Sequence, residues 1–155
     1  MSSKSLLGVL ALALVALPAI ADLEPYKDYN VSDAVYSVTT VKVDPNMDDA
    51  YLEGIKQTWA ASNEVAKGLG QIEDYWIFRS QLPQSGYFNL LLVIKLSHTS
   101  DLHPNKEDYD AFIEAWGKAN ADASTEYAQT NYPGMRKITG DYLMREITFV
   151  DESGD

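Results

Sequence analysis

Four stretches of the chain carry the apolar and β-branched residues that are typical of β-strands. They cover residues 34–43, 72–81, 87–97 and 136–150, and a bulge is expected in the last of them at Gly140. The turn residues of "LPQSG" separate the second stretch from the third, so we expect these two strands to form a hairpin. The chain therefore contains the strands of one small sheet.

Two segments between the strands have the spacing of an amphipathic helix instead. The first follows Asp44 and Asn46, either of which can cap it, and covers residues 47–67. The second begins after the N-cap Asn105 and carries a clear apolar stripe as far as Tyr127. One helix thus lies between the first and second strands, and the other between the third and fourth.

The resulting order, β-α-β-β-α-β, predicts a ferredoxin-like fold of the α+β class. In this fold a four-stranded antiparallel sheet carries both helices on one face and leaves its other face bare. Residues 34–150 account for the whole arrangement, and a domain of this length can bury a core. The bare face then needs an explanation.

The second strand, "IEDYWIFRSQ", has apolar residues on both of its sides. We assign Trp76 and Phe78 to the helix-covered side, which leaves Tyr75, Ile77 and Arg79 on the bare side. Alternation in the other strands adds Tyr36, Val38, Thr40, Tyr87, Asn89, Leu91, Tyr142, Met144 and Glu146 to the bare side. This surface is too apolar for open water, so we expect a second subunit to cover it.

The element order, the strand–helix join "VKVDPNMDDAYLEGIKQTW" and the hairpin "DYWIFRSQLPQSGYFNLLLVIKL" resemble the dimeric α/β-barrel superfamily over residues 34–150. That superfamily includes antibiotic-biosynthesis-type monooxygenases and many exported proteins of unknown role. The resemblance implies a homodimer in which two sheets pack face to face, with a pocket in each subunit. Because this scaffold hosts oxygenases, sensors and ligand binders, the resemblance does not fix the function.

The two ends of the chain differ in character from the domain. Residues 1–21 are typical of a secretory signal peptide, because Lys4 precedes a short apolar run and "AIA" offers a cleavage site. Residues 22–33 are polar and are predicted to be a flexible lead-in, and residues 151–155 are predicted to be an acidic disordered tail. We therefore expect an exported protein, periplasmic or secreted, that is free of the membrane after cleavage.

The composition excludes several classes of function. The chain has 23 acidic and 12 basic residues and a net charge of −11, which is the wrong sign for binding nucleic acid or anionic lipid. It has no cysteine, so its stability must come from packing or oligomerisation rather than disulfides. His98 and His103 flank Asp101 in one loop, where we expect exposed histidines rather than a metal site. We also predict no cofactor.

The bare face is the best candidate for a binding site, since an apolar enclosure with a few directed polar groups suits a small molecule. Arg79 can clamp a carboxylate or an enolate, and Glu146 can pair with Arg79 or act as a base. Alternatively, these two residues form a salt bridge at a dimer interface. The predicted ligand-binding residues are Tyr36, Tyr75, Ile77, Arg79, Asn89 and Tyr142.

Three functions remain open from the sequence. The leading one is an exported homodimer that binds a small apolar or aromatic molecule in a pocket between sheet and helices. The second is a cofactor-independent monooxygenase or isomerase of the antibiotic-biosynthesis type, with Arg79, Tyr75 and Glu146 as catalytic candidates. The third is a structural dimer without a ligand. In each case the predicted protein partner is a second copy of the chain.

Overall fold

A computed structural model describes residues 22–82 and 86–150 of the 155-residue chain. The predicted signal peptide, residues 1–21, and the predicted acidic tail, residues 151–155, lie outside the described residues. Within the described ranges, no helix is both long and apolar enough to cross a bilayer.

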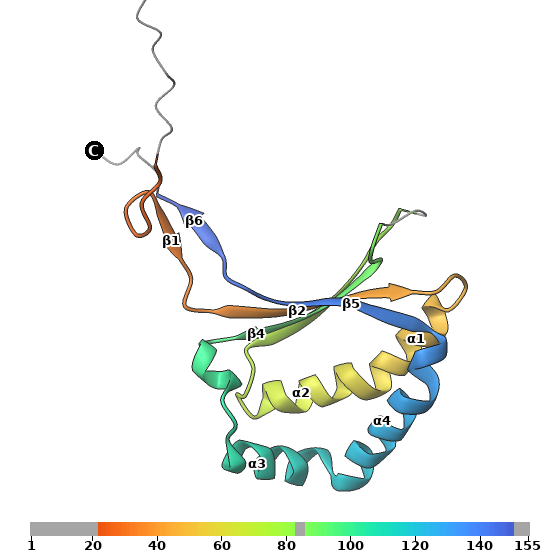
Figure 1. The fold of residues 1–155 in the computed structure, drawn as a ribbon. Helices are drawn as coiled ribbons and strands as arrows, with labels where there is room; N and C mark the ends of the chain where they lie inside the picture. The colour runs from red at the N-terminus through yellow and green to blue at the C-terminus, as the bar shows by residue number, and fades with distance from the viewer. Residues whose placement is uncertain (1–21, 83–85, 151–155) are drawn as a thin grey trace, which may run out of the picture.

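Four antiparallel strands form the main sheet, in the order β3-β4-β2-β5 (Figure 1). They are β2 (Val35–Val43), β3 (Asp74–Arg79), β4 (Leu90–Leu96) and β5 (Arg136–Met144). Strands β3 and β4 pair with each other as the predicted hairpin. The ferredoxin-like α+β class and the four-stranded antiparallel sheet that the pattern predicts are confirmed.

Strand β5 contains one extra residue relative to its neighbour β2. Thr40 lies opposite Gly140, whereas Val41 lies opposite Ile138, so Thr139 is the inserted residue. The Oγ1 atoms of Thr139 and Thr40 are 2.8 Å apart, which gives the bulge a hydrogen bond of its own. The predicted bulge is therefore present, one residue before Gly140, and it reverses the alternation of side chains along β5.

All the described helices lie on one face of the main sheet (Figure 1). The first helical segment passes from α1 (Asp48–Ile55) through a π-helical turn, η1 (Lys56–Ala60), into α2 (Ala61–Gly68). Inside the π turn the hydroxyl of Thr58 donates to the carbonyl of Gly54 at 2.9 Å. The predicted helix is thus confirmed, while its local widening to π geometry leaves no mark in the apolar pattern.

The second helical segment is divided into α3 (Lys106–Trp116) and α4 (Lys118–Asn131). Its predicted N-cap is confirmed, because Asn105 Oδ1 accepts a hydrogen bond from the Glu107 backbone N–H at 3.0 Å. The prediction of one unbroken helix is wrong. Gly117 separates the two helices with φ 87° and ψ 131°, a conformation that glycine adopts without a steric penalty.

The core lies between the main sheet and the first helical segment. Its buried residues are Val41 and Val43 from β2, Leu90 and Leu92 from β4, Tyr51 and Ile55 from α1, and Tyr132 from the turn η3 (Tyr132–Gly134). The hydroxyl oxygens of Tyr132 and Thr58 are 2.5 Å apart, so both polar groups are satisfied inside the core. Burial raises the pKa of Tyr51 and Tyr132 above the ordinary tyrosine value. Each buried aliphatic side chain contributes about 1.5–3 kcal/mol.

A second, two-stranded sheet pairs the two ends of the described chain. It consists of β1 (Tyr29–Val31) and β6 (Ile147–Phe149), which run antiparallel, and we call it the ribbon. Residues 22–33 are predicted to be a flexible lead-in, but the structure places part of them in β1. The last predicted strand, residues 136–150, is divided into β5 and β6. The pairing of β1 with β6 accounts for both differences. The pairing joins residues more than a hundred positions apart, and no local pattern reports such a contact.

Candidate functional site

The pairing register decides which face of the sheet each side chain occupies, because directly paired residues point to the same side. Leu92 lies in the core, and Ile77 of β3 is paired with it. The next residue, Val93, is paired with Trp76 of β3 and with Val38 of β2. Ile77 therefore faces the helices, and Trp76 faces away from them.

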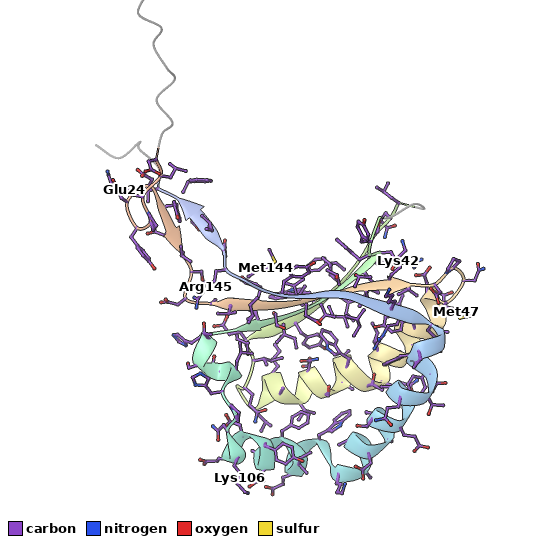
Figure 2. The ribbon with its side chains drawn as sticks, viewed as in Figure 1. Glu24, Lys42, Met47, Lys106, Met144 and Arg145 are labelled. Carbon is purple, nitrogen blue, oxygen red and sulfur yellow. The ribbon has the colours of Figure 1, made fainter. Side chains whose placement is uncertain are left out.

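We call the side of the main sheet that faces away from the helices the open face. Its apolar residues are Tyr36, Val38, Trp76, Phe78, Leu91, Val93, Tyr142 and Met144. Three of them are more than half exposed: Phe78 at 53%, Tyr142 at 54% and Met144 at 54%. Figure 2 shows Met144 on the side of the sheet opposite the helices. The open face is thus an apolar surface that the described helices leave uncovered.

Aromatic rings are arranged along the open face by the three strands that carry them. The ring centroids of Tyr36 and Trp76 are 6.3 Å apart, so these rings lie side by side across β4. The ring of Tyr142 lies back over Gly140, since a Cβ on that glycine would be only 2.7 Å from Tyr142 Oη. The bulge of β5 and the glycine next to it therefore fix where this tyrosine lies.

A hollow of about 230 Å³ opens at one end of the open face. Phe78, Phe88 and Leu91 give it apolar walls, and Ser80 and Asn89 also line it. The sequence predicts a pocket elsewhere, between the sheet and the helices. In the structure the core residues Val41, Leu90 and Ile55 pack together in that region.

The predicted faces of β3 are wrong, because the strand is turned over relative to the prediction. The ring of Tyr75 packs edge-on against Trp59 of η1, with centroids 5.5 Å apart, and its hydroxyl donates to Glu64 Oε2 at 3.2 Å. Arg79 Nη2 lies 3.0 Å from Asp48 Oδ2 of α1. Both partners belong to the helical layer. With apolar residues on both sides of the strand, alternation alone could not say which side that layer covers.

Arg79 and Glu146 do not pair with each other within one described chain. Arg79 is paired across the sheet with Leu90, next to the C-terminal end of β2, whereas Glu146 follows the end of β5 that lies beside Tyr36. Val41, which pairs with Leu90, and Tyr36, which pairs with Met144, are already about 16 Å apart along β2 at roughly 3.3 Å per residue, and Glu146 lies beyond Met144. Arg79, Tyr75 and Glu146 therefore do not converge on one reaction centre.

Asn89 is another predicted ligand-binding residue, and its side chain is occupied by the backbone of β2. Asn89 Oδ1 accepts from the Val43 backbone N–H at 2.7 Å, and Nδ2 donates to the Val43 carbonyl at 2.9 Å. The amide thus continues the hydrogen-bond ladder beyond the end of β4. Of the six predicted ligand-binding residues, Tyr36 and Tyr142 lie on the open face, and Asn89 lines the hollow at its end.

Trp76 and Phe78 lie on the open face, although the sequence pattern assigns them to the helix-covered side. One signal for them exists in the chain. Asp74, the first residue of β3, and Ser80, the residue after its end, share the parity of Trp76 and Phe78, and polar residues at both ends of a row favour the solvent side over the core. The competing signal was the size of the two aromatic rings, which favours burial.

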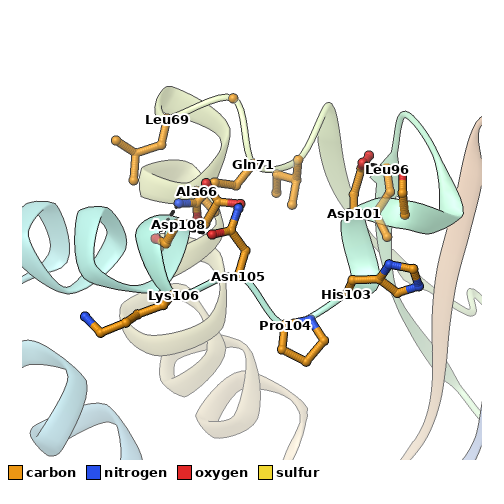
Figure 3. Close-up of a pocket in the computed structure, with 13 residues that line it drawn as sticks. Ala66, Leu69, Gln71, Leu96, Asp101, His103, Pro104, Asn105, Lys106 and Asp108 are labelled. Atoms are coloured by element: carbon orange, nitrogen blue, oxygen red, sulfur yellow. Dashed lines mark hydrogen bonds between the residues drawn. The ribbon is translucent and has the colours of Figure 1, made fainter.

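A larger hollow, of about 730 Å³, lies where α2 and β4 end and α3 begins, beside the turn η2 (Thr99–Leu102) (Figure 3). Its polar groups bind the protein's own backbone. Asp101 Oδ2 accepts from the His98 backbone N–H at 2.9 Å, and Gln71 Nε2 donates to the Asp108 carbonyl at 2.7 Å. His98 and His103 are exposed in this loop, and the described residues contain no cluster of three metal-binding side chains. These contacts order the loop.

Comparison with known proteins gives distant structural similarity. No family model and no curated protein matches the chain. HapK from Hahella chejuensis matches with 12% identity over 77% of this chain and 99% of its own, at a TM-score of 0.44. SO0527 from Shewanella oneidensis matches with 15% identity over 77% and 98%, at a TM-score of 0.41. A dimeric protein of unknown function and ferredoxin-like fold from Bacteroides fragilis matches with 9% identity over 78% and 100%, at a TM-score of 0.39.

Structures described as dimeric and ferredoxin-like are thus among those similar to this chain. At these identities and TM-scores, however, the similarity carries no ligand, activity or assembly over to this chain.

Proposed function

We propose that this protein is an exported homodimer, joined through the open faces of two main sheets, that holds a small aromatic or apolar molecule between them. The observation that carries the proposal is the open face itself. Its rings and Met144 are exposed although the sheet has a well-filled core on its other side. Export rests on the sequence of residues 1–21.

The area of the open face supports self-association. Phe78 and Tyr142, each more than half exposed, leave on the order of 100 Å² of ring surface each. Met144 and the partly exposed Tyr36, Trp76, Val38 and Leu91 extend this surface across all four strands. Such a patch exceeds what single exposed side chains give a monomer, and with the polar residues around it this face can supply an interface of roughly 800 Å² per partner. A second copy offers the matching surface, since a two-fold axis pairs a patch with itself.

The chemistry of the same face supports a ligand between the two sheets. Tyr36 and Tyr142 bring hydroxyl groups that need hydrogen-bond partners once they are buried. The hollow at Phe78 leaves space that a flat interface would not fill. Aromatic walls with a few hydroxyl groups favour a planar or apolar molecule that carries a polar substituent. The enzymatic alternative lacks comparable support, because its three catalytic candidates lie apart.

Dimerisation is tested by sedimentation of the chain without residues 1–21. We expect a dimer, and we expect Phe78→Asp to weaken it at least about 100-fold, because the new charge would be buried without a partner. Tyr109→Asp is the matched control: this aromatic residue of α3 is 63% exposed but lies on the helical layer, and its substitution should leave the dimer intact. A monomeric wild-type protein would overturn the proposal.

Ligand binding is tested by native mass spectrometry of the dimer as purified, followed by titration with the apolar dye anilinonaphthalene sulfonate. We expect a co-purified small molecule or saturable dye binding that Tyr36→Phe or Tyr142→Phe weakens while the dimer persists. Tyr109→Phe should have no effect. A dimer that carries no molecule and binds no dye would leave only the structural dimer, and the ligand half of the proposal would fail.

A further inference from the structure

The ribbon has one apolar face and one polar face. Its register pairs Tyr29 with Phe149 and Val31 with Ile147, so these four apolar residues point to the same side. Asn30 is paired with Thr148, and these two polar residues point to the other side. A strand pair with this pattern is built to lie on another apolar surface.

Within residues 22–82 and 86–150, the apolar face of the ribbon is only partly covered. Ile147 is 52% exposed and Phe149 is 67% exposed, although both lie in a paired strand. An isolated two-stranded ribbon is at best marginally stable in water. Further apolar contacts are therefore expected for a ribbon with this pattern.

The base of the ribbon is fixed to the main sheet by Arg145, which lies between β5 and β6 (Figure 2). Arg145 Nη1 donates to the carbonyls of Ser32 and Asp33 at 2.7 and 2.8 Å, and Nη2 donates to Thr99 Oγ1. These bonds join the two connections that lead into the ribbon to the turn η2. The direction of the ribbon is thus set by the sheet.

The ribbon projects from the main sheet on the same side as the open face. Figure 1 shows the ribbon rising from one end of the main sheet on the side away from the helices. Two sheets that pack face to face are separated by roughly 10 Å. The ribbon consequently extends into the layer that a second sheet on the open face would occupy.

We propose that the ribbon is an arm that lies against the second copy of the chain. Its apolar face, with Ile147 and Phe149, packs on the partner, and the two-fold axis places the partner's arm on this protomer in the same way. Each arm then closes one end of the space between the two open faces. The inference rests on the proposed homodimer, and it adds that the binding space is incomplete without residues of the partner.

A second copy fits this arm better than a lipid surface does. The chain has a net charge of −11, which opposes approach to anionic membranes. Its own open face, by contrast, is apolar and lies beside the arm, so a single partner can cover both surfaces at once. This continuity between the arm and the open face is the reason for choosing a second copy.

The first test compares the dissociation constant of the dimer in two variants by sedimentation. We expect the double substitution Ile147→Ser, Phe149→Ser to raise it about 30-fold or more, and Thr148→Ser, on the polar face of the ribbon, to change it by less than about 3-fold. The circular dichroism of the monomer at high dilution should be the same for both. If Phe78→Asp breaks the dimer but the ribbon variant does not, the arm is refuted while the proposed homodimer stands. A monomeric wild-type protein refutes both.

The second test locates the arm. A photoreactive phenylalanine analogue is placed at Phe149 and, as a control, at Thr148. Irradiation of the dimer should join two chains from position 149 and give far fewer dimer-sized products from position 148. The joined peptide should come from the partner's main sheet. Products confined to one chain would show that the ribbon folds over its own open face, and the proposal would be wrong.

Discussion

At the scale of single residues, the packing of the helical layer depends on the absence of a side chain at Gly54. This glycine is buried in α1, and a Cβ there would lie 2.8 Å from Tyr127 Cε1 and 3.1 Å from Tyr132 Cε1. The two tyrosine rings pack edge to face with centroids 5.6 Å apart, and Tyr132 packs on Tyr51 in the same way at 5.2 Å. A helix pattern gives no reason for the glycine; the tyrosines that require it come from the other end of the chain.

We expect Gly54→Ala to destabilise the protein by about 1–2 kcal/mol. Overpacking against the two rings costs about 1–3 kcal/mol, and the higher helix propensity of alanine recovers up to about 1 kcal/mol. Gly68→Ala is the control, because a Cβ at the last residue of α2 meets nothing within 4 Å. Urea unfolding followed by tryptophan fluorescence measures both. A Gly54→Ala protein as stable as the Gly68→Ala protein would contradict the close approach of the rings.

At the scale of elements, the structure differs from the sequence pattern at the break between α3 and α4. The apolar stripe continues through Gly117, yet this residue has φ 87° and the helix starts again at Lys118. Asn120 Nδ2 donates to the carbonyl of Trp116 at 2.7 Å and so satisfies an acceptor at the end of α3. The break lets α4 bring Tyr127 against the core. Packing of α4 has therefore overridden the preference for one straight helix.

The stability change caused by Gly117→Ala has opposite signs in an unbroken helix and in the observed break, so it distinguishes the two. In an unbroken helix Gly117→Ala would stabilise the protein by up to about 1 kcal/mol. In the observed conformation it should destabilise by roughly 1–3 kcal/mol, because a Cβ is strained at this φ. Thermal and urea unfolding by circular dichroism measure the change. Gly134→Ala, where the backbone has no positive φ and a Cβ meets nothing within 4 Å, should have a small effect.

At the scale of the whole molecule, the net charge opposes the association of two copies, whereas the apolar surface of the open face favours it. The chain carries a net charge of −11, so two copies repel one another when they approach. The open face contributes rings and Met144 rather than paired charges, and the nearest acidic and basic side chains, such as Glu73 and Lys95, already pair within one chain. The proposed dimer is thus held by apolar contact and opposed by long-range repulsion.

The dimer should therefore become tighter as salt is added. Raising the ionic strength from about 0.01 M to about 0.1 M shortens the screening length from about 30 Å to about 10 Å, so the repulsion falls while apolar contacts persist. We expect the dissociation constant to decrease several-fold, measured by sedimentation at a series of salt concentrations. A dimer that loosens instead would indicate an interface made of ion pairs between protomers.

The sequence by itself determined the class of the fold, the approximate positions of the four strands of the main sheet, the N-cap of α3 and the existence of a sheet face without helices. These features follow from the spacing of apolar residues and from turn chemistry, which act over a few residues. The tertiary structure alone decided which side of β3 faces the helices, where the second helical segment breaks, and that the ends of the chain pair as a ribbon. Arg79 is the clearest case: its partner Asp48 lies 31 positions away, and only the packing of α1 on the sheet brings the two charges together. Contacts of that kind are set by the three-dimensional arrangement of elements, which a local pattern does not contain.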